Sequence, residues 1–430
     1  MRALVLLIGI LGGLGMTVRY PYAGVLLWSW FTLQQPHREA YGFIRWTPLN
    51  VAIAIVTLGA WFLSRERKTP ATGFIFWMLV VFLVWMTFNS FFAFDTSWSW
   101  PYWDRTWKTL VLALLIAATA TSRVRIHALL WICVLSLFYY GVKGGLFTIM
   151  TGGFYHVVGP GGTIIADNNQ LALALLMSLP LALYLRAQSE NKLVANGLLA
   201  GIGLTVISIL GSYSRGAYIG LAALGMFMLW RAKNRFVYLG VIAVVALFAL
   251  NFMPQHFFDR IDTIQHAQQD ESFTGRLDAW YVAYRYATDH FPFGAGFYGP
   301  QLAALYHQYL PNDTPHAAHS IYFQVLGEHG FIGLAIYLII LAAAFLRCSK
   351  IVSVTRNVPE RRWAHDLAVA IQASLFVFCV GGAALSMAYY DLFIMEVALL
   401  LPLREIILLD AKEKRPAWSP PRQAVPQEAV

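Results

Sequence analysis

The chain is poor in charged residues and in cysteine. Only 12% of its 430 residues are Asp, Glu, Lys or Arg, whereas a soluble domain of this size carries about a quarter. Its three cysteines, Cys133, Cys348 and Cys379, lie in or beside apolar segments. The sequence therefore excludes an ordinary soluble enzyme, a disulfide-stapled secreted domain and a thiolate metal site.

Long apolar runs are what the sequence has in abundance, since 58% of its residues are hydrophobic. A helix that crosses a bilayer needs roughly 20 mostly apolar residues. We therefore predict an all-α, polytopic helical membrane protein. The apolar runs, taken with their flanks, lie at residues 51–63, 74–93, 126–150, 171–185, 193–210, 217–230, 237–252, 332–346, 367–385 and 392–409.

The net charge of +9 would suit a nucleic-acid-binding protein, but its distribution indicates membrane topology instead. Most Lys and Arg residues fall in alternate gaps between apolar runs, which is the pattern of cytoplasmic loops. We therefore expect membrane lipids around the chain and no nucleic acid as a partner. The basic clusters lie at residues 65–68, 123–125, 186–192, 231–235, 347–362 and 404–422.

The remaining gaps should then lie together on the outer side. About twelve spans with both termini in the cytoplasm follow if residues 1–34 make one net crossing as a broken or re-entrant helix. Residues 3–16 are similar to a signal-peptide core, but no cleavage site ends the run cleanly, so we expect it to be retained. The outer gaps are 34–47, 94–108, 151–167, 211–215 and 253–318.

Four regions follow from this topology. Residues 1–252 are the N-terminal transmembrane helices, 253–318 a large outer loop with amphipathic helices, 319–410 the C-terminal transmembrane helices and 411–430 a disordered, proline-rich cytoplasmic tail. The outer loop is far longer than an ordinary connection, so it should be functional or form a small domain. An apolar face of Phe257, Phe258, Ile261 and Ile264 predicts a surface helix at its start, unless the segment only covers the bundle.

Two arginines are candidate anion ligands. Arg276 follows Thr274-Gly275 in the first turn of an expected helix, where an anion would compensate its charge. The alternative is a solvated arginine paired with Asp278 or Asp289. Arg215 follows a tight turn at 211–214 and begins the next span, although it could simply reach the membrane interface. Two arginines in matching positions suggest a doubly charged ligand such as pyrophosphate.

The span that follows Asp167 opens with two amides. Asp167 is best explained as a helix cap. Asn168 and Asn169 enter an apolar span, so they are candidates for hydrogen bonds to a sugar or a phosphate.

Histidines at 316, 319 and 329, with His307 upstream, could bind a metal, cap a helix or act as a base. No carboxylate pair accompanies them at ligand spacing, and a capping or hydrogen-bonding role is an alternative. A neutral imidazole can take a proton from a hydroxyl near pH 7. His319 opens the span after the outer loop and is our candidate general base.

Four segments of the chain, in this order and spacing, resemble the bacterial O-antigen ligase and O-antigen polymerase superfamily. The similarity covers essentially the whole chain and is greatest to its O-antigen ligase and O-glycosylation ligase members. The segments are NNQLALALLMSLPL, SYSRGAYIGL, GRLDAWYVAYRYATDHFPFGAGFYG and HAAHSIYFQVLGEHGFIG.

The resemblance implies a GT-C-like, membrane-embedded glycosyltransferase of the bacterial inner membrane that needs no metal or cofactor. It would transfer a glycan from undecaprenyl pyrophosphate to the lipid A–core oligosaccharide on the periplasmic face. The essential histidine of the family's H-[SN] motif matches His319, and its S-R-G and G-R arginines match Arg215 and Arg276. His316 would be an accessory residue. Some relatives carry a second histidine where this chain has Ala318, so a two-histidine role does not carry over.

Three other functions remain open from the sequence. An O-antigen polymerase, or a ligase that glycosylates a protein hydroxyl, would use the same donor and the same residues. A transporter of lipid-linked glycans would need charged residues inside spans and paired broken helices. Lys143 is the one clear cation inside a predicted span. Direct attack of a hydroxyl on the donor would invert the anomeric centre.

Overall fold

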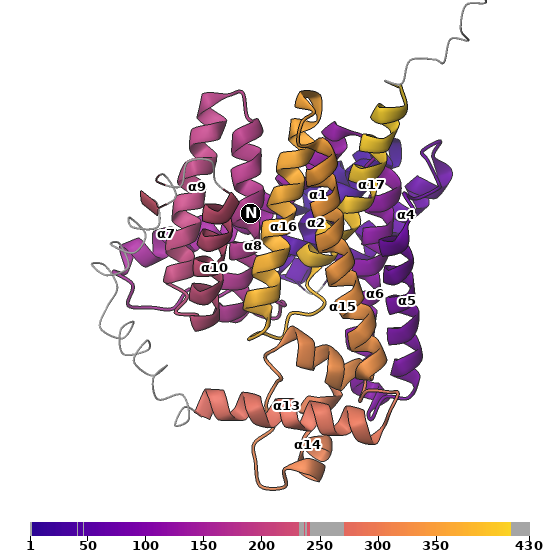
Figure 1. Ribbon diagram of the computed structural model, residues 1–430, viewed down its shortest axis with the longest axis vertical. Coiled ribbons are helices and arrows are strands. Elements are labelled where there is room, and N and C mark those ends of the chain that lie inside the picture. Colours follow the sequence, from indigo (N-terminus) through magenta and orange to yellow (C-terminus); the bar gives the residue numbers. More distant parts are fainter. Residues whose placement is uncertain are drawn as a thin grey trace, which may run out of the picture.

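The structure is a computed structural model that describes residues 2–40, 42–45, 47–231, 236, 239–240 and 271–413. Within these ranges all regular structure is helical and no strand is present (Figure 1). The helices are α1 (Arg2–Arg19), α2 (Pro21–Gln34), α3 (Pro36–Glu39), η1 (Phe43–Arg45), α4 (Leu49–Leu63), α5 (Phe74–Phe91), α6 (Thr96–Thr119), α7 (Arg123–Met150), α8 (Asn168–Gln188), α9 (Lys192–Leu210), α10 (Arg215–Arg231), α13 (Glu271–Asp289), η3 (Gly299–Gln301), α14 (Ala303–Tyr309), α15 (Ile321–Thr355), η4 (Pro359–Arg361), α16 (Arg362–Gly382) and α17 (Asp391–Glu413).

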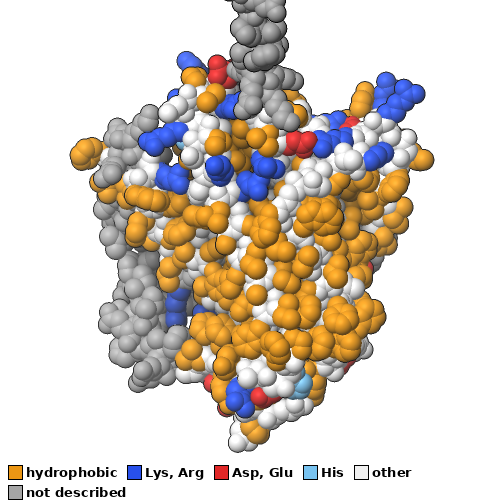
Figure 2. All heavy atoms as spheres, turned by 45° about the vertical axis from the view of Figure 1, so that its right-hand side comes forward, with side chains coloured by type: hydrophobic (Ala, Val, Ile, Leu, Met, Phe, Trp, Pro, Cys, Tyr) orange, Lys and Arg blue, Asp and Glu red, His pale blue; other side chains and the backbone are white. Residues whose placement is uncertain are grey.

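The apolar runs of the sequence coincide with helices, apart from 237–252, of which only residues 239 and 240 are described. Six helices of the described part are long and apolar enough to cross a membrane, and α1 and α4 are shorter apolar helices. Hydrophobic side chains cover the middle of the visible face of the molecule (Figure 2). The chain is therefore a multi-pass helical membrane protein, and the count of about twelve spans stays a prediction.

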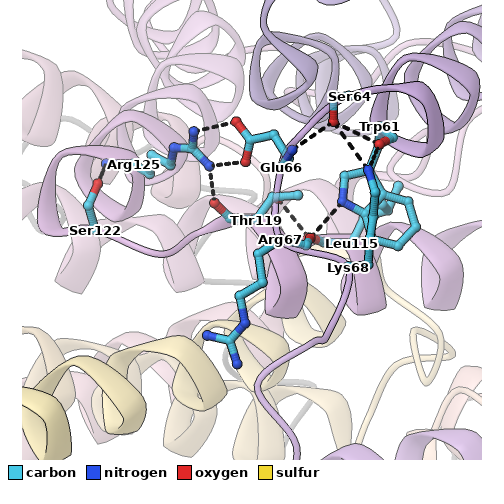
Figure 3. Close-up of polar contacts among 9 residues, drawn as sticks. All are labelled: Trp61, Ser64, Glu66, Arg67, Lys68, Leu115, Thr119, Ser122 and Arg125. Carbon is cyan, nitrogen blue, oxygen red and sulfur yellow. Dashed lines mark hydrogen bonds and ion pairs between the residues drawn. The ribbon is translucent and has the colours of Figure 1, made fainter.

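The clusters of Lys and Arg come together at one end of the bundle, which we name the basic end (Figure 2). Both carboxylate oxygens of Glu66 accept hydrogen bonds from Arg125, at 2.6 and 2.7 Å, and Arg125 also donates to the Thr119 carbonyl (Figure 3). Arg67 pairs with Glu405 at 2.6 Å. Gaps that are far apart in sequence thus share one end, as the charge pattern predicts.

The predicted outer gaps meet at the opposite end, which we name the site end. Phe94 N donates to Ala295 O and Val157 N donates to Gly211 O, both at 2.9 Å. A Cβ built on Gly162 would lie 3.7 Å from Arg38 Nη1. These contacts link 94–108 to the described part of 253–318, and 151–167 to both 34–47 and 211–215. The contacts agree with the predicted grouping of these loops, and their outward orientation stays a prediction.

The first 34 residues form a helical hairpin, which agrees with the predicted broken or re-entrant helix but not with one net crossing. Tyr20 has an extended backbone and Pro21 begins α2, which ends α1 because a proline cannot continue that helix. The two helices then pack antiparallel through small residues. A Cβ on Gly24 would clash with Thr17 at 2.4 Å, and one on Gly13 would lie 3.1 Å from Leu27. Both ends of the hairpin therefore lie toward the site end.

At the site end, α13 lies crosswise below the spans and α14 lies below α13 (Figure 1). The two share a small core of their own, which consists of Ala279, Val282, Tyr286, Ala295, Leu305 and Tyr306. The surface helix predicted near 254–268 lies outside the described residues. At the other end of the chain α17 continues to Glu413, so the predicted tail does not begin at 411, and the rest of it is outside the described residues.

Helix α15 is broken at Gly330, whose φ of 69° and ψ of −174° are not helical. The loop of residues 290–300 inserts into this break. Ala295 N and Gly296 N donate to the carbonyls of Gly327 and Glu328, at 2.8 and 2.9 Å. These bonds satisfy carbonyl groups that the break would otherwise leave without partners.

Asn89 of α5 locks this loop in place. Its side chain donates to the Glu328 carbonyl at 2.8 Å and accepts from Gly294 N at 2.9 Å. A Cβ on Gly294 would lie only 2.4 Å from the Glu328 backbone, so the loop can approach this closely because glycine has no side chain. The loop therefore holds α13 to the first part of α15.

Candidate active site

Arg276 lies in the second turn of α13, and the prediction that it opens a helix is wrong. The helix includes Glu271, five residues earlier. Gly275, which suggested a turn, is instead a buried helical position. A Cβ there would lie 2.7 Å from the His316 ring, so glycine serves the packing of His316. The argument for an anion at a helix N-terminus therefore does not apply to Arg276, and the hypothesis of an anion there depends on its guanidinium alone.

The segment of residues 316–320 is fixed against α13. Its His316 ring packs on Gly275, and Trp280 Nε1 donates to the Ala318 carbonyl at 2.6 Å. The Trp280 ring also stacks on Phe323 of α15, with centroids 4.7 Å apart and planes 4° apart. The tryptophan therefore ties α13 to both sides of His319. From the sequence, Trp280 was only one of several aromatic residues on a predicted helix face, and its contact with the segment around His319 was not predicted.

His319 is half-buried immediately before α15 and has a left-handed backbone with φ of 41°. Few non-glycine residues adopt this conformation, and such strain is found most often at functional sites. Burial lowers the pKa of His319, and the nearby Arg276 guanidinium and His316 ring lower it further, whereas the Asp167 carboxylate opposes them. The structure thus brings His319, Arg276, His316 and Asp167 together and favours a neutral imidazole.

Arg215 begins α10, as predicted, after a tight turn. Ser212 Oγ accepts from Ser214 N at 3.3 Å and Ser214 Oγ accepts from Ala217 N at 3.2 Å. Between them Tyr213 has a φ of 56°, and its hydroxyl donates to the Gly153 carbonyl. The turn therefore presents Arg215 at a helix N-terminus, where the backbone also favours an anion.

The end of α16 contacts the starts of both α10 and α15, close in sequence to Arg215 and His319. A Cβ on Gly216 would lie 3.8 Å from Ala384 Cβ, just after α16. On the other side of the same helix end, a Cβ on Gly382 would lie 2.9 Å from Ile321 of α15. The starts of α10 and α15 therefore both pack against the C-terminal end of α16. Arg215 directly precedes Gly216 in the sequence, and His319 lies two residues before Ile321.

The start of α8 completes the site. Asp167 caps the helix, as predicted, by accepting from Asn169 N at 2.9 Å. Asn168 Nδ2 donates to the Ser212 carbonyl at 2.6 Å, which ties α8 to the turn before Arg215. Asn169 Nδ2 donates to the side chains of Asp167 and Asn168. Both amides thus support the site, and their binding of a sugar or phosphate stays a prediction.

The other two histidines of the predicted cluster lie elsewhere. His329 is fully buried beyond two further turns of α15, with the Phe297 ring centroid 4.5 Å from its own. His307 is exposed on α14 and contacts the Asp313 carbonyl at 3.1 Å. Among the described residues no group of three or more His, Cys, Asp or Glu is placed to hold a metal ion.

Glu328 is a buried carboxylate that the sequence reading did not use. Its two oxygens accept from Tyr298 N at 3.1 Å and from the Tyr389 hydroxyl at 2.6 Å. These bonds join the inserted loop to the start of α17 and to α15. Its position next to an apolar span could have drawn attention to it in the sequence, because carboxylates are rare there and usually functional. The structure gives it a supporting place in the frame around the site.

Two known protein families match parts of the chain. A family described as O-antigen ligase matches residues 200–338, which include Arg215, Arg276, His316 and His319. A family of unknown function (DUF5935) matches residues 1–190. No curated protein matches the chain. Residues 200–338 are therefore similar to the O-antigen ligase family.

Proposed function

We propose that the chain is an O-antigen ligase that transfers a glycan from undecaprenyl pyrophosphate to a hydroxyl of the lipid A–core oligosaccharide. The reaction would take place at the periplasmic face of the bacterial inner membrane. The observation that carries the proposal is a half-buried His319 held beside Arg276, at the helix end that also positions Arg215. A base and two cations at one membrane surface suit a lipid-linked pyrophosphate donor.

The proposed reaction is a direct displacement. His319 accepts the proton of the acceptor hydroxyl while the oxygen forms a bond to the anomeric carbon of the glycan. The bond between that carbon and the pyrophosphate oxygen breaks, so the anomeric centre is inverted. Arg215 and Arg276 stabilise the negative charge that develops on the leaving pyrophosphate. His319 then releases its proton to water, and no metal or cofactor enters the scheme.

Reconstitution with defined substrates tests the proposal. We expect the purified chain, with lipid-linked glycan and lipid A–core in vesicles containing EDTA, to form the joined product. Parallel reactions should replace the acceptor with a second lipid-linked glycan or with a protein. Product with only one of these would convert the assignment to a polymerase or a protein glycosylation ligase. Movement of intact lipid-linked glycan between leaflets, with no transfer to any acceptor, would contradict the assignment of the chain as an enzyme.

The rate of transfer should depend on pH through His319. Because burial and Arg276 lower the pKa of His319 below its usual value of 6.5, the neutral base should persist in mildly acidic solution. We therefore expect kcat/KM to fall only below pH 6.5, as the imidazole becomes protonated. Removing the positive charge in Arg276→Gln raises that pKa and should move the fall to higher pH.

The comparison uses initial rates of the reconstituted protein between about pH 4.5 and pH 8. Arg285→Gln is the matched control, because Arg285 lies on the same helix and pairs with Asp289 at 3.7 Å. It should leave the midpoint unchanged. A wild-type midpoint above 6.5, or an equal profile in Arg276→Gln, would show that His319 is not the titrating base.

A further inference from the structure

A cationic cavity lies at the site end, in the N-terminal part of the chain. It has a volume of about 1130 Å³ and opens among α1, α2, α3 and α7, with Pro160 and Gly161 on its rim. Its charged lining consists of Arg38, Arg45, Lys143 and Glu39. The residues of the candidate active site do not line it. The loop that carries Gly161 leads on to Asp167, so the two places are neighbours along the chain.

The cavity has an excess of positive charge, with three basic side chains and one carboxylate. Glu39 is already engaged, because Lys143 Nζ lies 3.4 Å from one of its oxygens and the Tyr139 hydroxyl donates to the other at 2.5 Å. Arg38 Nε is buried, and no described atom accepts a hydrogen bond from it. A guanidinium in this state favours an anionic ligand.

The cavity lies at a membrane boundary. Lys143 comes 20 residues after Arg123 on the same helix, which corresponds to roughly 30 Å of rise, about the thickness of the hydrocarbon layer. Arg123 is at the basic end, so Lys143 lies at the opposite surface. The Lys143 side chain is 63% exposed. The cation that the sequence placed inside a span therefore belongs to this cavity.

One wall of the cavity is apolar and continues onto the outside of the protein. Val5, Leu6 and Trp30 line it, and Val5 is 70% exposed beside Leu4 and Ile8 of α1, each 62% exposed. These apolar side chains face lipid in a membrane protein. A ligand that fills the cavity therefore needs an anionic head and a hydrocarbon chain. Free inorganic phosphate would gain nothing from this wall.

We propose that this cavity binds the phosphate headgroup of a membrane lipid. Arg38, Arg45 and Lys143 hold the phosphate, and the hydrocarbon chain lies along Val5 and Leu6 of α1. Basic pockets between membrane helices bind lipid headgroups by this combination of charge and apolar surface. The site is separate from the proposed pyrophosphate site, and the proposal stands whether or not the chain is a ligase.

Binding of defined lipids to the purified full-length chain tests the site. Native mass spectrometry in detergent should show dioleoyl phosphatidylglycerol retained in preference to dioleoyl phosphatidylcholine, which has the same chains and no net charge. The double variant Arg38→Gln/Lys143→Gln should bind phosphatidylglycerol at least 10-fold more weakly, and Lys143→Arg should bind it normally. Inorganic phosphate should not compete at the concentration of the lipid.

The matched control is Arg186→Gln/Lys192→Gln, which removes two exposed cations at the basic end and should bind like the wild type. Equal binding of phosphatidylglycerol to the cavity variant and the wild type would overturn the proposal. Equal retention of phosphatidylcholine would overturn it too, because charge would then not be recognised. Effective competition by inorganic phosphate would assign the cavity to a free anion instead.

Discussion

Replacing His319 with asparagine is expected to lower the rate of glycan transfer about 1,000-fold. Asparagine has no base of suitable pKa, whereas it tolerates the left-handed backbone of this position better than most residues. His319→Ala should lose activity equally, with a small additional cost in stability from its φ of 41°. Initial rates of the reconstituted variants, together with their elution profile and thermal unfolding, separate catalysis from folding.

Two other histidines serve as controls for this result. His307→Asn should be fully active, because His307 is exposed on α14 and is separate from the site. His316→Asn should retain most activity, since His316 acts by packing on Gly275 and by its charge near His319. Near-normal transfer by folded His319→Asn would refute the assignment of the base, and equal losses in all three variants would show a general effect on folding.

The second large effect concerns the donor. Arg276→Ala should weaken binding of undecaprenyl pyrophosphate about 30-fold, because a half-buried charge that contacts an anion contributes about 2 kcal/mol or more. Arg276→Lys keeps the positive charge but cannot make bidentate hydrogen bonds, so its loss of donor affinity should be smaller than that of Arg276→Ala. The dissociation constant can be measured by titrating the unreactive pyrophosphate lipid into the protein in nanodiscs.

Arg285→Ala provides the comparison on the same helix. Arg285 is 46% exposed and pairs with Asp289, so its removal should leave donor affinity unchanged. Arg215→Ala should weaken the same binding from the start of α10. An unchanged dissociation constant in Arg276→Ala would remove Arg276 from the pyrophosphate site, and a transfer defect at full donor affinity would place it at the acceptor.

The arrangement of the spans could be predicted because it depends on local patterns. Apolar runs gave the helices, and the alternation of basic clusters grouped the loops into two ends. The tight turn before Arg215 and the cap at Asp167 were also visible, since both depend on residues adjacent in sequence. The break in residues 1–34 was expected, but the return of α2 to the end where α1 begins was not, because it depends on packing between the two helices.

The site itself depends on contacts between distant residues, which such patterns do not encode. The sequence grouped four histidines, but only His316 and His319 lie together, because α15 carries His329 into the core. Gly275 read as a turn, whereas the His316 ring occupies the space where a side chain would be. The break at Gly330 was hidden because the sequence on either side is helical in pattern.

The loop inserted at Gly330 has a consequence for how such proteins can diversify. It fixes α13 to α15 and α5, so the separation between Arg276 and His319 is set by the frame behind them. Residues 311–314, by contrast, are exposed and follow α14 at the far side of the small core. Insertions or substitutions there contact neither the membrane spans nor the inserted loop. Changes in residues 311–314 could therefore alter which acceptor is recognised while the separation between Arg276 and His319 stays the same.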